Sequence, residues 1–118
     1  MKLLIDWDGG STVVNPGKPF VIGRDKSADI QVVGSKVSRT HLRLEFTGNH
    51  WKAIDLDSSN GTFYEGKPFS ELEIFDQISI FLGGDSGQEI RLHPLQLGAK
   101  KTKETNRKVQ VPKADQTL

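Results

Sequence analysis

The 118-residue chain has no cysteine, one methionine, one tyrosine and no long apolar run. The absence of cysteine excludes structural disulfides, thiolate zinc sites, iron–sulfur clusters and a cysteine nucleophile, and it suits a reducing compartment. No stretch approaches the ~20 apolar residues of a membrane-spanning helix, and the apolar run at the start is too short for a signal peptide. We therefore expect a cytoplasmic protein, or a cytosolic domain of a larger protein, that does not insert into membranes.

The net charge of +1 is the sum of two unlike parts of the chain. Residues 1–97 hold 10 basic and 13 acidic side chains, a balance of −3, whereas residues 98–118 hold 6 basic and 2 acidic ones, a balance of +4. The second part has no aromatic residue and no apolar period, which is typical of solvated chain. We predict a single domain over residues 1–97 and a charged flexible tail or linker over residues 98–118.

Residues 1–97 consist of short β-type runs separated by turn residues, with almost no helical signal. Leu42, Leu44 and Phe46 alternate with polar neighbours, as on a strand with one buried face. The run 51–56 breaks this alternation, so it either carries a bulge or contributes to both faces of a sheet. The pattern is typical of a β-sandwich or barrel. The expected strands are 2–7, 11–14, 19–22, 29–33, 42–46, 51–56, 62–64, 72–74, 77–82 and 89–93.

Three polar clusters lie directly beside expected strands, where no strand face explains them. They are residues 23–24, 38–41 and 58–62. Arg24 supplies a planar fork of five N–H donors, and Ser38 and Ser59 supply hydroxyls. Asn60 is both a donor and an acceptor. If the three loops converge, Arg24 and Ser38 could bind a phosphate, while Asn60 pairs with the backbone of an extended peptide. No group in this set is an obvious catalytic base, so we expect a binding protein without enzymatic activity and without a cofactor.

The same residues carry a resemblance to a known family. Gly23-Arg24, then Ser38 with His41, then the run Asp57-Ser58-Ser59-Asn60-Gly61-Thr62 resemble, in order and spacing, the forkhead-associated (FHA) family of phosphothreonine-binding domains. The resemblance spans about residues 20–82 and does not cover the tail. It implies an all-β fold, an eleven-stranded sandwich of two twisted antiparallel sheets of the FHA/SMAD-like type, with recognition loops at one end.

The resemblance also implies a role for each motif residue. Arg24 and Ser38 would contact the phosphate, and Arg39 would support it. Ser59 would add a contact near the phosphothreonine, and Asn60 would hold the main chain of the peptide. The remaining motif positions would be mainly architectural, namely Gly23, His41, Gly61 and Thr62.

Lys36 lies two residues before the motif serine, a position that in this family can read the side chain three places after the phosphothreonine. A lysine there predicts a preference for an acidic residue. The implied partner is a phosphothreonine-containing protein, such as a Ser/Thr-kinase substrate or a phosphorylated segment of the same protein, and the isolated domain is expected to be monomeric. The alternative is a phosphate-independent protein-interaction domain on the same fold.

Other patterns predict other functions less well. Ser38 and His41 could belong to a hydrolase triad, but no nucleophile elbow or oxyanion-hole signature accompanies them. His41, His50 and His93 lack the spacing of metal ligands, so we expect no metal site. A near match to a phosphate-binding P-loop has Pro68 where that loop needs a serine or threonine.

The tail carries its basic residues without interleaved aromatic side chains, so we expect no specific nucleic-acid binding. Thr102, Thr105 and Thr117 lie near charged residues in this segment. A kinase could phosphorylate them and thereby create a ligand for the same domain or for a neighbouring one.

Overall fold

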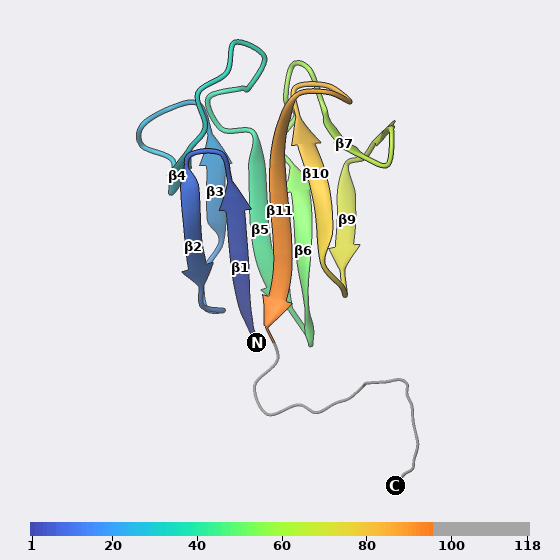
Figure 1. The fold of residues 1–118 in the computed structure, drawn as a ribbon. Helices are drawn as coiled ribbons and strands as arrows, with labels where there is room; N and C mark the ends of the chain where they lie inside the picture. Colours follow the sequence, from blue (N-terminus) through green and yellow to red (C-terminus); the bar gives the residue numbers. More distant parts are fainter. Residues whose placement is uncertain (96–118) are drawn as a thin grey trace, which may run out of the picture.

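The computed structural model describes residues 1–95, which form eleven β-strands in two facing sheets (Figure 1). The first sheet contains β1 (Lys2–Trp7), β2 (Gly10–Val14), β7 (Thr62–Tyr64), β8 (Lys67–Pro68), β10 (Ile78–Leu82) and β11 (Gln88–Leu95). The second contains β3 (Phe20–Gly23), β4 (Ile30–Gln31), β5 (Leu42–Thr47), β6 (His50–Asp55) and β9 (Glu71–Ile74). The strand orders are β2-β1-β11-β10-β7-β8 and β4-β3-β5-β6-β9. None of the described residues forms a helix long and apolar enough to cross a bilayer.

This architecture confirms the predicted all-β sandwich, and each expected strand is present with small shifts at its ends. One pair is parallel, β3 with β4, where Ile22 lies opposite Ile30. β4 is shorter than the predicted strand 29–33, since regular pairing with β3 ends at Gln31, and Val33 is 78% exposed. The tail predicted over residues 98–118, with its threonines, lies outside the described residues.

The eleventh strand, β8, lies where the sequence predicts only a turn. Phe63 pairs with Pro68 and Tyr64 with Lys67, so β7 and β8 form a hairpin with a two-residue connection. Glu65 and Gly66 in that connection have φ values of 50° and 82°. Positive φ at both central residues is the geometry of the tight hairpin turns that match the twist of the flanking strands. Asparagine or aspartate is the usual first residue of such a turn, so the glutamate here did not indicate one.

β6 settles the question of the run 51–56. Its register with β5 is continuous, from His50 opposite Thr47 to Asp55 opposite Leu42, so the strand has no bulge. Trp51 is fully buried, whereas Ile54 is half-buried on the other face of the sheet. The strand therefore contributes apolar side chains to both faces.

The core fills the space between the two sheets. Trp51 is its largest fully buried side chain, donates from Nε1 to the Met1 carbonyl at 3.1 Å, and meets Phe46 edge-on at 5.5 Å between ring centroids. Each large apolar side chain buried in this way contributes about 1.5–3 kcal/mol to folding. Side chains from both sheets take part, including Leu3, Ile5, Ile22, Leu42, Leu44, Ile80, Ile90 and Leu92.

The strand directions bring the loops after β3, before β5, after β6 and after β10 to one end of the sandwich (Figure 1). The first residues of β1 and the end of β11 lie at the opposite end, where Lys2 pairs with Leu95.

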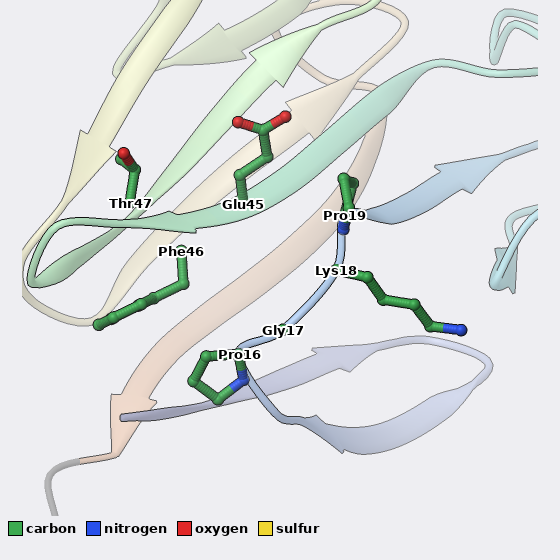
Figure 2. A pocket seen from close by; sticks show the side chains of 7 residues that line it. All are labelled: Pro16, Gly17, Lys18, Pro19, Glu45, Phe46 and Thr47. Carbon is green, nitrogen blue, oxygen red and sulfur yellow. The ribbon is translucent and has the colours of Figure 1, made fainter.

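A hollow of about 370 Å³ lies at this opposite end, between the loop Pro16–Pro19 and the end of β5. Figure 2 shows Phe46 pointing to the side of β5 on which this loop passes, while Glu45 and Thr47 point to the other side. The sequence-predicted binding motifs are therefore all remote from this hollow.

Candidate functional site

The end of β3 is held tightly against the loop that precedes β5. The Arg24 amide donates to the Ser38 carbonyl at 2.9 Å, and the Asp25 amide donates to the Arg39 carbonyl at 3.2 Å. Gly23 is buried, and a Cβ atom at this position would overlap the Arg39 carbonyl. The close approach of the two backbones therefore requires glycine, and it places Arg24 beside Ser38.

Arg24 has an exposed side chain that is nevertheless oriented by the protein. Its Nε donates to the Val37 carbonyl at 2.9 Å, and its own carbonyl accepts from the Gln31 side chain at 3.0 Å. Within residues 1–95 its two terminal nitrogens have no hydrogen-bond partner. The guanidinium therefore keeps four N–H donors for a ligand and has already lost part of its rotamer freedom.

His41 connects two of the loops through its ring. The Ser38 amide donates to Nδ1 at 2.9 Å, so Nδ1 is the unprotonated nitrogen, and Nε2 donates to the Gly61 carbonyl at 2.9 Å. The ring is completely buried. Burial lowers the pKa of His41 below its ordinary value, against the opposing effects of the Gly61 carbonyl and of Asp55, whose carboxylate lies 3.9 Å from Nε2. A neutral ring is the form that can serve both loops at once.

Asp55, at the end of β6, organises the loop 56–61. Its carboxylate accepts from the Ser58 hydroxyl and the Thr62 hydroxyl, each at 2.6 Å, and from the Ser58 amide at 3.0 Å. Ser58 in turn accepts from the Gly61 amide at 3.0 Å. Burial alone would raise the pKa of Asp55, but these hydrogen bonds outweigh it and hold the pKa below its ordinary value. The carboxylate is thus the acceptor that fixes the second half of the motif.

Ser38, Ser59 and Asn60 meet at the surface of the same end. The Ser59 amide donates to the Ser38 hydroxyl oxygen at 3.0 Å, which leaves the Ser38 hydroxyl hydrogen free to donate. Asn60 donates from Nδ2 to the Lys36 carbonyl at 3.1 Å and keeps its amide oxygen available. The three loops that the sequence predicts to converge are therefore joined by direct hydrogen bonds.

A fourth loop, between β10 and β11, supports this arrangement from behind. The Gly83 amide donates to the Gly61 carbonyl at 2.9 Å, the same oxygen that accepts from His41. Gly83 has a φ of 91°, and a Cβ atom there would lie 2.8 Å from the Lys36 carbonyl oxygen. Backbone conformation and close packing both require glycine at this position.

Exposure divides the predicted site residues into two groups. The first group is exposed or, in the case of Ser38, half-buried, and comprises Arg24, Lys36, Ser38, Arg39, Ser59 and Asn60. The second is buried or half-buried and comprises Gly23, His41, Gly61 and Thr62. The first group is accessible from solvent, and the second makes the loop-to-loop and loop-to-strand contacts described above.

Sequence reasoning overlooked two contributors to this site, Asp55 and Gly83. Asp55 reads as an ordinary polar position on a strand, although the spacing Asp-x-x-Ser to Ser58 is a signal of a local side-chain-to-backbone turn. Gly83 reads as one half of a Gly-Gly turn. Its contact with Lys36 joins residues 47 positions apart, and no local pattern in the sequence encodes that contact.

The geometry disfavours the two other readings of these residues. Ser38 meets the His41 ring through its backbone amide, and its hydroxyl bonds to Ser59 instead, so the pair lacks the hydroxyl-to-imidazole bond of a hydrolase triad. His50 pairs with Thr47 at the far end of the sandwich, and His93 lies on an outer face opposite Leu4. Residues 1–95 contain no group of three or more potential metal ligands.

Comparisons with known proteins agree with this geometry. The sequence model described as FHA domain matches residues 20–83. The ABC transporter ATP-binding/permease protein Rv1747 of Mycobacterium tuberculosis is 32% identical over 85 residues, and the crystal structure of its FHA-1 domain superposes with a TM-score of 0.76 at 29% identity, covering 78% of this chain and 94% of that one. The FHA domain-containing protein FhaA of the same organism is 31% identical over 93 residues.

Two further solved structures are similar. The FHA domain of FhaA, crystallised with the intracellular domain of Rv3910, has a TM-score of 0.68 at 29% identity and covers 77% of this chain and 99% of that one. A domain from a study of phosphothreonine-dependent FHA interactions has a TM-score of 0.72 at 28% identity and covers 82% of this chain and 100% of that one. The two-sheet sandwich of this chain is thus the fold of solved FHA domains. The chain belongs to the FHA domain family.

The curated relatives are much longer than this chain. The match covers 72% of the chain but 10% of Rv1747, and 79% of the chain but 18% of FhaA. In both relatives the matching region is therefore one domain of a larger protein.

Replacing Gly23 by alanine should disrupt the site from its base. The added methyl overlaps the Arg39 carbonyl, so we expect Gly23→Ala to lower the free energy of unfolding by about 2 kcal/mol or more in urea titrations. Gly34→Ala is the matched control, because the atoms nearest to its Cβ would be side-chain atoms of Gln88 and Val37, at 3.2 Å, and not backbone. Equal stability of the two variants would contradict the assignment of Gly23 to a backbone contact.

Because His41 is buried and its pKa is lowered, the free energy of unfolding should decrease when the pH is lowered. Its folded pKa lies below that of the unfolded chain, about 6.5, so the unfolded chain takes up a proton first and the free energy of unfolding decreases as the pH falls from 7 to 5. The lowered pKa of Asp55 adds a further loss only below about pH 4. His41→Asn should be less stable at pH 7 but flatter between pH 7 and 5 in urea unfolding followed by tryptophan fluorescence. Parallel pH profiles of the two proteins would refute this role.

Proposed function

We propose that this chain is a non-enzymatic module that binds phosphothreonine peptides and thereby recruits a phosphorylated partner. The observation that carries the proposal is the state of Arg24. Its Nε donates to the Val37 carbonyl, its backbone amide donates to the Ser38 carbonyl, and its terminal N–H groups have no partner within residues 1–95. A planar guanidinium fork, with a short hydroxyl on the loop to which it is bonded, suits a tetrahedral dianion. The family to which the chain belongs supports the same function.

The phosphate is held by a few placed donors. A phosphothreonine carries about −1.5 to −2 charges at neutral pH, and hydrogen bonds to charged groups contribute about 1.5–3 kcal/mol each. Arg24 and Ser38 supply such bonds, with Arg39 and Ser59 beside them. Two or three of these bonds together with main-chain contacts correspond to binding in the micromolar range, about −8 kcal/mol.

The peptide backbone is held by Asn60. One N–H of its Nδ2 group donates to the Lys36 carbonyl, and its second N–H and its amide oxygen remain to pair with the main chain of the peptide. The same bond fixes the backbone of Lys36 and leaves the exposed lysine side chain free to meet an acidic residue three places after the phosphothreonine. One hydrogen bond thus couples the residue that holds the peptide to the residue that reads it.

The proposed biological setting is Ser/Thr-kinase signalling or phosphorylation-controlled assembly in the cytoplasm, with this chain as a domain of a larger protein. The relatives support it, since one is part of a transporter and another was crystallised with an intracellular domain of a second protein. The alternative is a phosphate-independent interaction domain on the same fold. In that case the terminal N–H groups of Arg24 would bind no phosphate.

Removing the Arg24 side chain should abolish most of the phosphate-dependent affinity. In titrations with matched threonine, phosphothreonine and phosphoserine peptides, we expect the phosphothreonine peptide to bind most tightly and Arg24→Ala to weaken it about thirtyfold or more. Arg43→Ala, which removes an arginine paired with Glu45 on an outer sheet face, should leave the affinity unchanged. Equal binding of all three peptides would favour the phosphate-independent alternative.

Reversing the charge of Lys36 should invert the peptide preference. On an array of phosphothreonine peptides varied at the third residue after the phosphothreonine, the wild-type domain should enrich aspartate and glutamate, and Lys36→Glu should enrich lysine and arginine. Lys67→Glu, on β8, changes the net charge equally and should keep the wild-type preference. An array without acidic enrichment for the wild type would rule out this role of Lys36.

A further inference from the structure

The two sheets have four edge strands, and three of them are protected against pairing with another chain. β4 and β8 are only two residues long, and β8 contains Pro68, which has no amide hydrogen. β9 places Glu71 and Glu73 along its edge. Short length, proline and charge are the usual means by which proteins prevent sheet edges from recruiting further strands.

The fourth edge, β2, has none of these protections. It is five residues long, has the sequence Gly-Ser-Thr-Val-Val, and carries no charge and no proline. Thr12, Val13 and Val14 are β-branched residues that favour extended chain. Within residues 1–95 its backbone pairs with β1 alone, so one row of its N–H and C=O groups is open. Val13 is 47% exposed on the outer face of the sheet, opposite Leu4.

We infer that β2 is a self-association edge, on which β2 of a second copy of this chain adds in antiparallel orientation. The ends of the strand carry opposite charges, because Asp8 precedes it and Lys18 follows it. Neither side chain has an ion-pair partner within residues 1–95, and Figure 2 shows Lys18 extending away from β5. A two-fold axis near Thr12 brings Asp8 of one copy towards Lys18 of the other, whereas parallel pairing would bring like charges together.

The paired edge has a defined length and side-chain content. With Thr12 on the axis, the two threonines face each other and Ser11 lies opposite the partner's Val13, both on the outer face. Cross-strand pairs of threonines and of β-branched residues are favourable in antiparallel sheets. Pro16 and Pro19 limit the pairing to β2 itself, since neither can donate a backbone hydrogen bond beyond the strand.

The association is weak and leaves the phosphate-binding end open. Five residues on each side bury far less than the ~1,200–2,000 Å² of stable complexes, so we expect a sub-millimolar dimer. Antiparallel pairing directs the motif loops of the two copies to opposite ends, and a dimer can therefore hold two phosphorylated partners at once. This differs from the monomer expected from the sequence, and it does not depend on the proposed phosphothreonine binding.

Sedimentation equilibrium of the 118-residue chain at concentrations from about 10 μM to 1 mM tests the proposal. The wild type should show a monomer–dimer equilibrium. Val13→Lys and Val13→Glu should each weaken the dimer about tenfold, because each places two like charges at diagonally neighbouring positions of the paired strands, within reach of long side chains. An equimolar mixture should regain wild-type affinity. Ser11→Lys serves as a second variant in case a substitution at Val13 impairs folding, which thermal unfolding would reveal.

Phe75→Lys is the control, because it replaces an apolar residue that is 63% exposed and that follows β9, an edge strand of the other sheet. It should dimerise as the wild type does. A monomeric wild type at 1 mM, equal weakening by Phe75→Lys, or a mixture of the Val13 variants that fails to regain affinity would each overturn the proposal.

Discussion

The positions of the motif loops at one end of the sandwich depend on one buried imidazole. His41 accepts from the backbone of one motif loop and donates to the backbone of another, so both loops take their positions from the same ring. Neither bond can be replaced by water, because the ring is fully enclosed. An unpaired buried polar group costs about 1–3 kcal/mol. A change at Ser38, His41 or Gly61 that breaks one of these bonds therefore destabilises the positions of the other two residues.

The Gly61 carbonyl extends this dependence to a third connection. It accepts from His41 and from the Gly83 amide, which uses both of its lone pairs. Asp55 closes the network from the opposite side through its bonds to Ser58 and Thr62. The exposed donors on top of this network are thereby held in place by backbone atoms and by short side chains, which lose little entropy on ordering. Such preorganisation lowers the cost of binding a small charged group.

Charge distribution explains why the binding end has to be built from placed donors. Residues 1–97 carry a net charge of −3, so the domain has no general positive field to attract a polyanion. Arg24, Arg39 and Lys36 gather on loops of an otherwise acidic domain. Their effect is confined to a distance comparable to the Debye length, about 8 Å at physiological salt. In the proposed function, affinity would therefore come from contact geometry, which favours a compact ligand such as a phosphorylated side chain.

Much of the fold was predictable because period-two alternation and turn residues are local signals. The strands at Lys2–Trp7 and Thr62–Tyr64 have the bounds that their patterns predict. β8 was missed because its pairing depends on a hairpin turn whose glutamate adopts a positive φ without the usual sequence signal. The motif residues could be found from type and spacing, whereas Asp55 and Gly83 act through contacts that exist only after the sheets have packed.

One feature of the topology concerns how such a domain can be carried by other proteins. β1 and β11 are neighbours, and Lys2 lies directly opposite Leu95, so the chain enters and leaves at nearly the same point. Paired antiparallel residues have Cα atoms about 4.5–5.5 Å apart, so both ends of the domain can be joined to one surface loop of a host protein. The domain can be appended to a chain end or inserted within a host with little distortion of either, and in both settings its motif loops face away from the point of attachment.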